Sequence, residues 1–181
     1  MLISLLNRSD TRVGLSEIDW MSSGATGATL ADQYTLSGQG RAQQTQVAVP
    51  GGRLIIEQEN GQPAWLMPVV KVMGELLDLP ENWDSYGARR INPTAIAFAL
   101  QLLFDTMRSD TPSPSVVPTS RGGVQLEWHA HGIDLEIEIR SPGRLYVCYE
   151  DLRHDVEWEG ELTFDLTRLS GFVSELSRHE Q

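Results

Sequence analysis

Three residues with metal-binding side chains, Glu127, His129 and His131, occupy alternate positions of the sequence. Alternate residues of a strand point to the same face of a sheet, so the three side chains could lie together. Imidazole nitrogens and a carboxylate are ligands that zinc and other divalent ions accept. The alternative is that His129 pairs with Asp134 across a hairpin, and the sequence leaves both hypotheses open.

A second segment rich in polar and aromatic side chains is residues 82–88, Asn-Trp-Asp-Ser-Tyr-Gly-Ala. Trp83 and Tyr86 can stack or hydrogen-bond, and together with Asp84 and Ser85 they are candidates for a binding or catalytic loop. The same residue types also build rigid connectors, because Asp and Ser side chains bond nearby amides and Gly adopts unusual backbone angles. Ser85 lacks a Gly-x-Ser-x-Gly context, so the structural and functional interpretations stand side by side.

Motifs of several enzyme classes are missing. The sequence has no glycine-rich phosphate loop, no zinc-finger spacing and no dinucleotide-binding fingerprint. The single cysteine, Cys148, cannot form a disulfide within the chain. Carboxylates beside it in the predicted sheet would raise its pKa and reduce its reactivity. We therefore expect no cofactor and no nucleophilic cysteine.

The 181-residue chain has a formal net charge of −11 and is 40% hydrophobic. A charge of this sign argues against a general electrostatic contact with phosphate groups, so we expect no direct binding of nucleic acid. No stretch approaches the ~20 apolar residues of a membrane span, and residues 1–6 lack the basic segment of a secretory signal. These features predict a cytoplasmic protein that does not enter a membrane.

The clearest pattern lies between residues 124 and 164, where apolar and polar side chains alternate as in half-buried strands. A two-residue turn at His131-Gly132 would pair residues whose numbers sum to 263. A three-residue turn at Ser141-Pro142-Gly143 would pair residues whose numbers sum to 284. Both registers place the apolar side chains on one face. A further strand over 156–164 follows a turn whose register the sequence does not fix.

The polar face of this predicted sheet gathers carboxylates. It carries Glu127, Asp134, Glu136, Glu138, Glu150, Glu157, Glu159 and Glu161, with Arg140 and Arg144 at its rim. Residues 123–165 contain eleven carboxylates and three arginines, so −8 of the net charge of −11 lies in this segment. Glu127 would lie opposite Glu136, which costs roughly 0.2–1 kcal/mol. Three interpretations of such a face stay open: it keeps the protein in solution, it binds a basic partner, or it binds cations.

Apolar residues at helical spacing predict three helices, over residues 66–79, 93–108 and 166–178. Asn92 is the expected N-cap of the second helix and Asp165 that of the third.

The N-terminal part is harder to interpret. Residues 21–46 are rich in Gly, Ser, Thr, Ala and Gln. This composition predicts loops or partial disorder and leaves room for short strands. Pro50-Gly51-Gly52 between two apolar runs predicts a hairpin. We predict an α+β fold, an antiparallel meander sheet of four or more strands packed on one face by about three helices. Residues 1–46 would be an N-terminal extension, and residues 47–181 a single domain.

Two segments, residues 79–88 with their Asn-Trp-Asp-Ser-Tyr-Gly-Ala run and residues 122–128, Gly-Gly-Val-Gln-Leu-Glu-Trp, resemble a family of small, uncharacterised bacterial proteins. The likeness covers roughly residues 77–150. It implies no activity, cofactor or site residue, and it supports treating residues 47–181 as one unit.

Together these observations predict a non-enzymatic binding module of the inhibitor, antitoxin or immunity type, which presents its acidic sheet to a basic protein. A special case is a DNA mimic, whose carboxylates occupy the groove of a nucleic-acid-binding protein. The predicted contact residues are Glu127, Asp134, Glu136, Glu138, Glu157, Glu159 and Glu161, with Trp83, Asp84 and Tyr86 of the loop. The rival hypothesis is an enzyme or metal-binding protein that uses Asp84, Ser85 and Tyr86, or His129 and His131, in a deep pocket.

Overall fold

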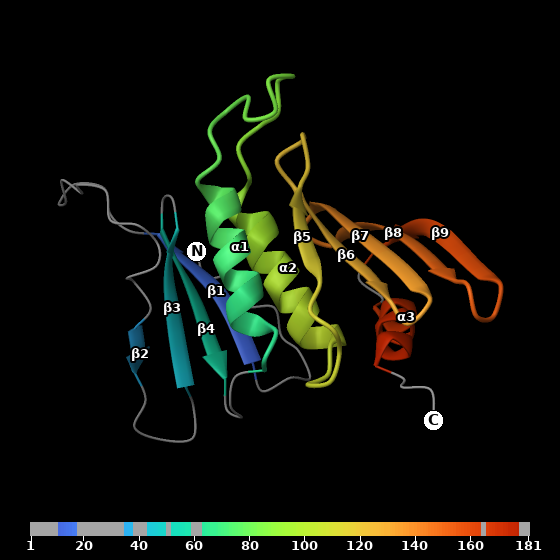
Figure 1. Ribbon diagram of the computed structural model, residues 1–181. Coiled ribbons are helices and arrows are strands. Elements are labelled where there is room, and N and C mark those ends of the chain that lie inside the picture. Colours follow the sequence, from blue (N-terminus) through green and yellow to red (C-terminus); the bar gives the residue numbers. More distant parts are fainter. Residues whose placement is uncertain are drawn as a thin grey trace.

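The computed structural model describes residues 11–17, 35–37, 43–49, 52–58, 63–163 and 166–177. The first of its two antiparallel sheets has the order β1-β4-β3-β2, and the second has the order β5-β6-β7-β8-β9 (Figure 1). The strands of the first sheet are β1 (Thr11–Glu17), β2 (Thr35–Ser37), β3 (Gln43–Val49) and β4 (Gly52–Gln58). Those of the second are β5 (Ser115–Pro118), β6 (Val124–Ala130), β7 (Ile133–Ser141), β8 (Arg144–Asp151) and β9 (Val156–Leu162). The helices are α1 (Leu66–Leu77), α2 (Pro93–Thr106) and α3 (Thr167–Leu176).

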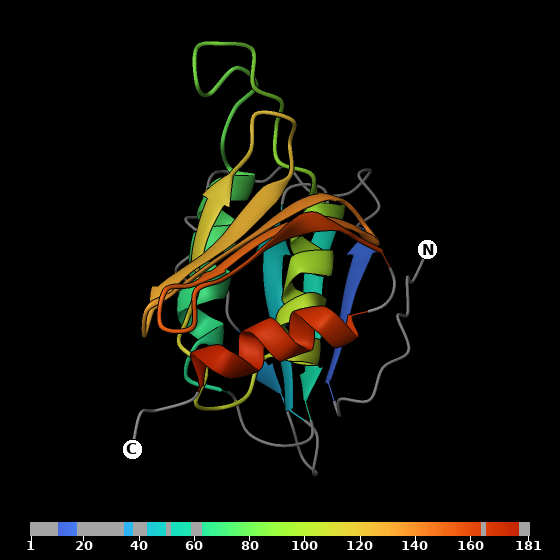
Figure 2. The same cartoon turned by 90° about the vertical axis from the view of Figure 1, so that its right-hand side faces the viewer.

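Helices α1 and α2 lie between the two sheets (Figure 1). Helix α2 contacts β1 on one side and β6 and β7 on the other, and α1 contacts β3 and β5. Helix α3 lies beside α2 and packs against β7, on the same face of the second sheet (Figure 2). The predicted α+β fold, with an antiparallel meander covered on one face by three helices, is confirmed.

The first predicted hairpin register is confirmed. In β6 and β7, Trp128 lies opposite Leu135, as the sum of 263 requires. His131 and Gly132 form the turn with φ angles of 56° and 71°, the left-handed values of a two-residue hairpin turn.

The second register is confirmed between β7 and β8. Leu135 lies opposite Tyr149, and the pairing shifts by one residue between Ile139 and Ser141. Ser141 is the last residue of β7 and lies opposite Arg144, so the turn consists of Pro142 and Gly143 and not of the three residues that the sequence predicts. Arg140 is the extra residue at the bulge, and Gly143 has a positive φ of 77°.

The helices lie where the sequence predicts them, with ends that differ by one or two residues. The Asn92 side chain caps α2 by accepting a hydrogen bond from the backbone N–H of Thr94 at 2.9 Å. The N-cap position of α3 belongs to Leu166, which makes no side-chain cap bond, and Asp165 lies outside the described residues.

The sequence predicts only part of the first sheet. The hairpin around Pro50-Gly51-Gly52 is confirmed as β3 and β4, with Val49 opposite Gly52. The sequence pattern did not reveal β1, which pairs with β4 along its whole length. The boundary that we place after residue 46 falls inside β3, and the division into an extension and a domain stays a prediction.

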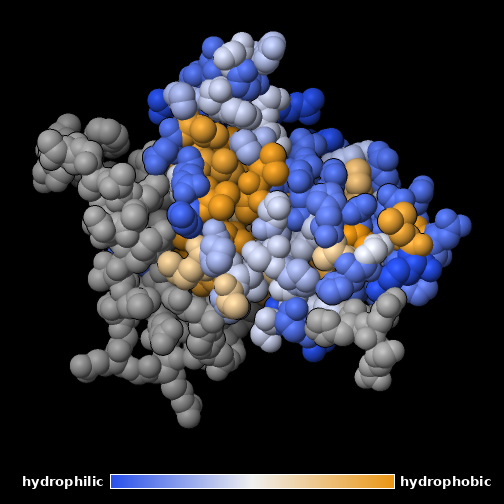
Figure 3. Space-filling view, viewed as in Figure 1, coloured by the Kyte–Doolittle hydropathy of each residue, from blue (hydrophilic) through white to orange (hydrophobic). Residues whose placement is uncertain are grey.

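The core lies between the second sheet and the helices. Trp128 is 2% exposed, and its indole N–H donates to the carbonyl of Pro112 at 2.8 Å. This bond ties the connection between α2 and β5 to strand β6. An apolar strip extends to the surface over α1 and β5, whereas hydrophilic residues predominate over the second sheet (Figure 3).

Candidate functional site

The second sheet has one apolar and one acidic face because its residues alternate. Along β6, β7 and β8 the inward side chains are buried, and most of the outward ones are half-buried. Helix α3 covers part of the apolar face, where Phe172 stacks on Tyr149 with ring centroids 4.1 Å apart. The opposite surface, called here the acidic face, comprises Glu127, Asp134, Glu136, Glu138, Glu150, Glu157, Glu159 and Glu161.

Carboxylates oppose one another at two places on the acidic face. Glu127 lies opposite Glu136, and Glu150 lies opposite Glu157. The amide of Gln125 lies between the first pair and donates to Glu127 at 2.9 Å and to Glu136 at 3.1 Å. This amide offsets part of the repulsion by hydrogen bonding but brings no positive charge.

Positive charge gathers at one end of the acidic face. The Arg140 guanidinium donates to Glu138 at 2.8 Å and to Glu161 at 3.2 Å, and its bond to Glu138 raises its pKa. Arg144 approaches Glu161 at 3.5 Å. Among the described residues, no Lys or Arg forms an ion pair with Glu127, Asp134, Glu136, Glu150 or Glu157.

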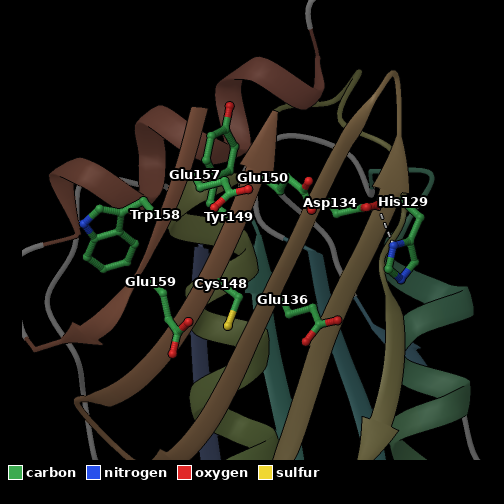
Figure 4. Close-up of a pocket in the computed structure, with 9 residues that line it drawn as sticks. All are labelled: His129, Asp134, Glu136, Cys148, Tyr149, Glu150, Glu157, Trp158 and Glu159. Atoms are coloured by element: carbon green, nitrogen blue, oxygen red, sulfur yellow. Dashed lines mark hydrogen bonds and ion pairs between the residues drawn. The ribbon is translucent and has the colours of Figure 1, made fainter. Parts of the chain in front are cut away.

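The acidic face contains a depression of about 560 Å³. It spans β6 to β9, and the carboxylates lie along it (Figure 4). Its lining residues are His129, Asp134, Glu136, Cys148, Tyr149, Glu150, Glu157, Trp158 and Glu159. The depression therefore offers many acceptors of hydrogen bonds and one titratable imidazole.

His129 pairs with Asp134 across the hairpin, as one of the two hypotheses predicts. Its Nδ1 lies 2.7 Å from Asp134 Oδ1, and its Nε2 lies 3.9 Å from Glu127 Oε2. The hydrogen bond to Asp134 raises the pKa of His129, and the charges of Asp134, Glu127 and Glu136 add to this effect. His131 lies in the turn, and the described residues include no group of three His, Cys, Asp or Glu side chains placed to hold a metal ion.

Cys148 lies between Glu136 on β7 and Glu159 on β9. Burial raises the pKa of its thiol, and the charges of Glu136 and Glu138 raise it further. A raised pKa leaves less of the thiol as thiolate and so reduces its reactivity as a nucleophile.

The loop between α1 and α2 is held by its own hydrogen bonds. Asp84 Oδ1 accepts from the N–H of Tyr86 at 2.8 Å and of Ala88 at 3.0 Å, and these bonds lower the pKa of Asp84. Trp83 donates from its ring to the carbonyl of Arg89 at 3.3 Å. Ser85 has a φ of 64°, so the loop holds a backbone angle that few residues adopt.

This loop docks against the start of the second sheet. Asn92 N–H donates to the carbonyl of Gly122 at 2.8 Å, and Arg89 N–H donates to that of Ser120 at 3.0 Å. A Cβ atom on Gly122 would lie 2.6 Å from the carbonyl oxygen of Arg90, so the close approach requires glycine. Backbone contacts of the residues just after the loop therefore hold it against the segment that leads into β6.

The predicted contact residues fall into two groups. The seven carboxylates share the acidic face, whereas Trp83, Asp84 and Tyr86 lie in the loop and do not line the depression. Tyr86 is 92% exposed.

The sequence prediction missed the residues that fix the turn between β8 and β9. The carboxylate of Asp151, which is 3% exposed, accepts two hydrogen bonds from the Arg153 guanidinium, each 3.0 Å long. His154 Nδ1 lies 2.8 Å from the same carboxylate. The bonds to Arg153 hold the pKa of Asp151 far below its usual range. The only signal in the sequence is the close spacing of an acidic residue with Arg and His.

We found no match to the chain among models of protein families, among curated proteins or among solved structures. Over the part of the chain that the structure describes, no helix combines the length and the apolar character that crossing a membrane requires.

Proposed function

We propose that the protein is a non-enzymatic binding module that holds a basic protein through the acidic face, as an inhibitor, an antitoxin or an immunity protein does. The observation that carries this proposal is the opposition of Glu127 to Glu136 and of Glu150 to Glu157. Each opposed pair costs the fold roughly 0.2–1 kcal/mol. Arg or Lys side chains of a partner would relieve this repulsion, and the field of the face would speed their approach.

The rival hypothesis of an enzyme has less support. Burial and the charges of Glu136 and Glu138 raise the pKa of the Cys148 thiol, which reduces its reactivity. The loop residues Asp84, Ser85 and Tyr86 do not line the depression. His129 and Cys148 both line the depression, but the raised pKa of the thiol makes Cys148 a weak nucleophile, which favours binding over catalysis.

The test compares three forms of the protein as bait in a lysate of its own cells. One is the wild type, and one carries Glu136→Gln and Glu159→Gln on the acidic face. The third, called the α1 variant, carries Glu75→Gln on α1 and Asp78→Asn at its C-cap, two exposed positions. Both variants lose the same charge. We expect a basic protein to bind the wild type and the α1 variant but not the acidic-face variant. Equal retention by all three forms would contradict the proposal.

The DNA-mimic case is a narrower version of the same proposal. It requires that the captured partner binds nucleic acid and that duplex DNA competes with the protein for it. If the partner binds DNA and the protein at the same time, the acidic face is an ordinary interface and not a DNA mimic.

A further inference from the structure

Strand β9 forms an outer edge of the second sheet. The strand order ends at β9, and none of the described elements pairs with its outer side (Figures 1 and 2). An edge of this kind presents a row of unpaired N–H and C=O groups, to which another strand can bind.

The register shows which backbone groups face outward. In a two-residue hairpin the residues that flank the turn exchange both hydrogen bonds, so Ala130 and Ile133 are a bonded pair. Bonded and non-bonded pairs alternate along a ladder, and each residue of an inner strand bonds to one side only. Followed through β7 and β8, this alternation points the N–H and C=O groups of Glu157, Glu159 and Glu161 away from the sheet.

The same three residues place their side chains on the acidic face, and all three are exposed. On the opposite face of the sheet, Trp158 of β9 packs against Phe172 with ring centroids 5.5 Å apart. The Arg168 guanidinium lies over the Trp158 ring. A Cβ atom on Gly160 would lie 3.0 Å from the Trp158 ring, so the ring lies along the strand over this glycine. The edge therefore has an acidic side and an apolar side.

A second copy of this chain is a poor occupant of the edge. Two β9 strands paired antiparallel would bring glutamates against glutamates, which is unfavourable. The opposite edge, β5, is short and contains Pro118, which cannot donate a hydrogen bond. The charge of β9 instead complements a strand with positive side chains.

We propose that β9 accepts an extended segment of the basic partner as a sixth strand of the sheet, with Arg or Lys at every second position. This inference rests on the proposed function and specifies how the partner binds. Basic side chains opposite Glu157 and Glu159 would lie within reach of the carboxylates, and the intervening apolar side chains would lie beside Trp158 and Leu162. A basic side chain opposite Glu161 would contribute less to binding, because Arg140 and Arg144 already form ion pairs with that carboxylate.

The experiment uses the full chain and two synthetic peptides of identical composition. One alternates arginine and valine, and the other has three arginines followed by three valines. We expect the alternating peptide to bind about tenfold more tightly, because only its pattern matches both sides of the edge. It should also slow hydrogen exchange at the amides of Glu157, Glu159 and Glu161. Replacing Glu157 and Glu159 by Gln should weaken the binding of the alternating peptide more than Glu161→Gln does.

Each other outcome has a defined meaning. Strand addition would be overturned if both peptides bound equally, with NMR chemical-shift changes centred on Glu127 and Glu136 and no slowing of hydrogen exchange in β9. This outcome would leave the proposed function intact. Failure of both peptides to bind at low salt would overturn both proposals. Protection of β9 that grows with protein concentration in the absence of peptide would assign the edge to a second copy and overturn this inference.

Discussion

At the residue scale, Glu157 lies opposite Glu150 and has no Lys or Arg partner among the described residues. Replacing Glu157 by Gln removes like-charge repulsion, so we expect the free energy of unfolding to rise by roughly 0.2–1 kcal/mol. Urea denaturation measures this change. Glu161→Gln is the control and should give no gain, because Glu161 pairs with Arg140 and Arg144. An equal rise in the free energy of unfolding of both variants would mean that ion pairs to Arg140 and Arg144 do not decide the result.

His129 gives a second prediction. The bond to Asp134 raises its pKa, so its contribution to stability is fully present below about pH 6.5 and is lost as the pH rises through the folded-state pKa. An NMR titration of the imidazole should give a midpoint above that of an unperturbed histidine, and Asp134→Asn should lower this midpoint. The same midpoint in both proteins would show that the bond is absent in solution.

The stabilisation that Asp151 provides has the opposite pH dependence to that of His129. Its lowered pKa means that the carboxylate stabilises the fold above about pH 4, and that this contribution is lost as the pH falls towards the folded-state pKa. Asp151→Asn removes the charged partner of Arg153 and should cost about 2 kcal/mol in urea denaturation at pH 7. The difference from the wild type should shrink in acid, and a constant difference down to pH 3 would contradict this origin.

At the element scale, two glycines test how closely the elements pack. A Cβ atom on Gly123 would lie 2.4 Å from the carbonyl oxygen of Ile139, so Gly123→Ala should destabilise the protein by about 1–3 kcal/mol. Gly171 lies in α3 with nothing within 4 Å of the added atom, and Gly171→Ala should stabilise by up to about 1 kcal/mol. Thermal unfolding distinguishes the two, and a stabilising Gly123→Ala would contradict the close approach of the two strands.

The sequence predicts those elements whose side chains alternate over many residues. The registers of β6, β7 and β8 follow from this alternation and from turn residues such as Gly132 and Gly143. The register of β9 does not, because side-chain bonds of Asp151 to Arg153 and His154 fix its turn. Strand β5 has only four residues, which is too few to display a period.

The candidate site is predictable to the same extent. The carboxylates share one face because the registers are predictable. The separation of Tyr86 from that face depends on where the loop docks, and the contacts at Ser120 and Gly122 that decide this are between backbone atoms. Backbone contacts leave little trace in residue types.

At the scale of the whole molecule, the net charge of −11 is unevenly distributed. The fold places eight carboxylates of the second sheet on the face that the helices leave open, and it places two arginines at one end of that face. A protein with this distribution attracts basic partners to one surface, and salt screens the attraction.

The most direct test of this account is the association rate constant of a hexa-arginine peptide, measured by stopped flow at low salt. Two variants of identical net charge are compared with the wild type. One carries Glu136→Gln and Glu159→Gln on the acidic face, and the other carries Glu75→Gln on α1 and Asp78→Asn at its C-cap. We predict that the acidic-face variant associates several-fold more slowly than the α1 variant, and that the difference vanishes near 1 M salt. Equal rates for the two variants at low salt would contradict it.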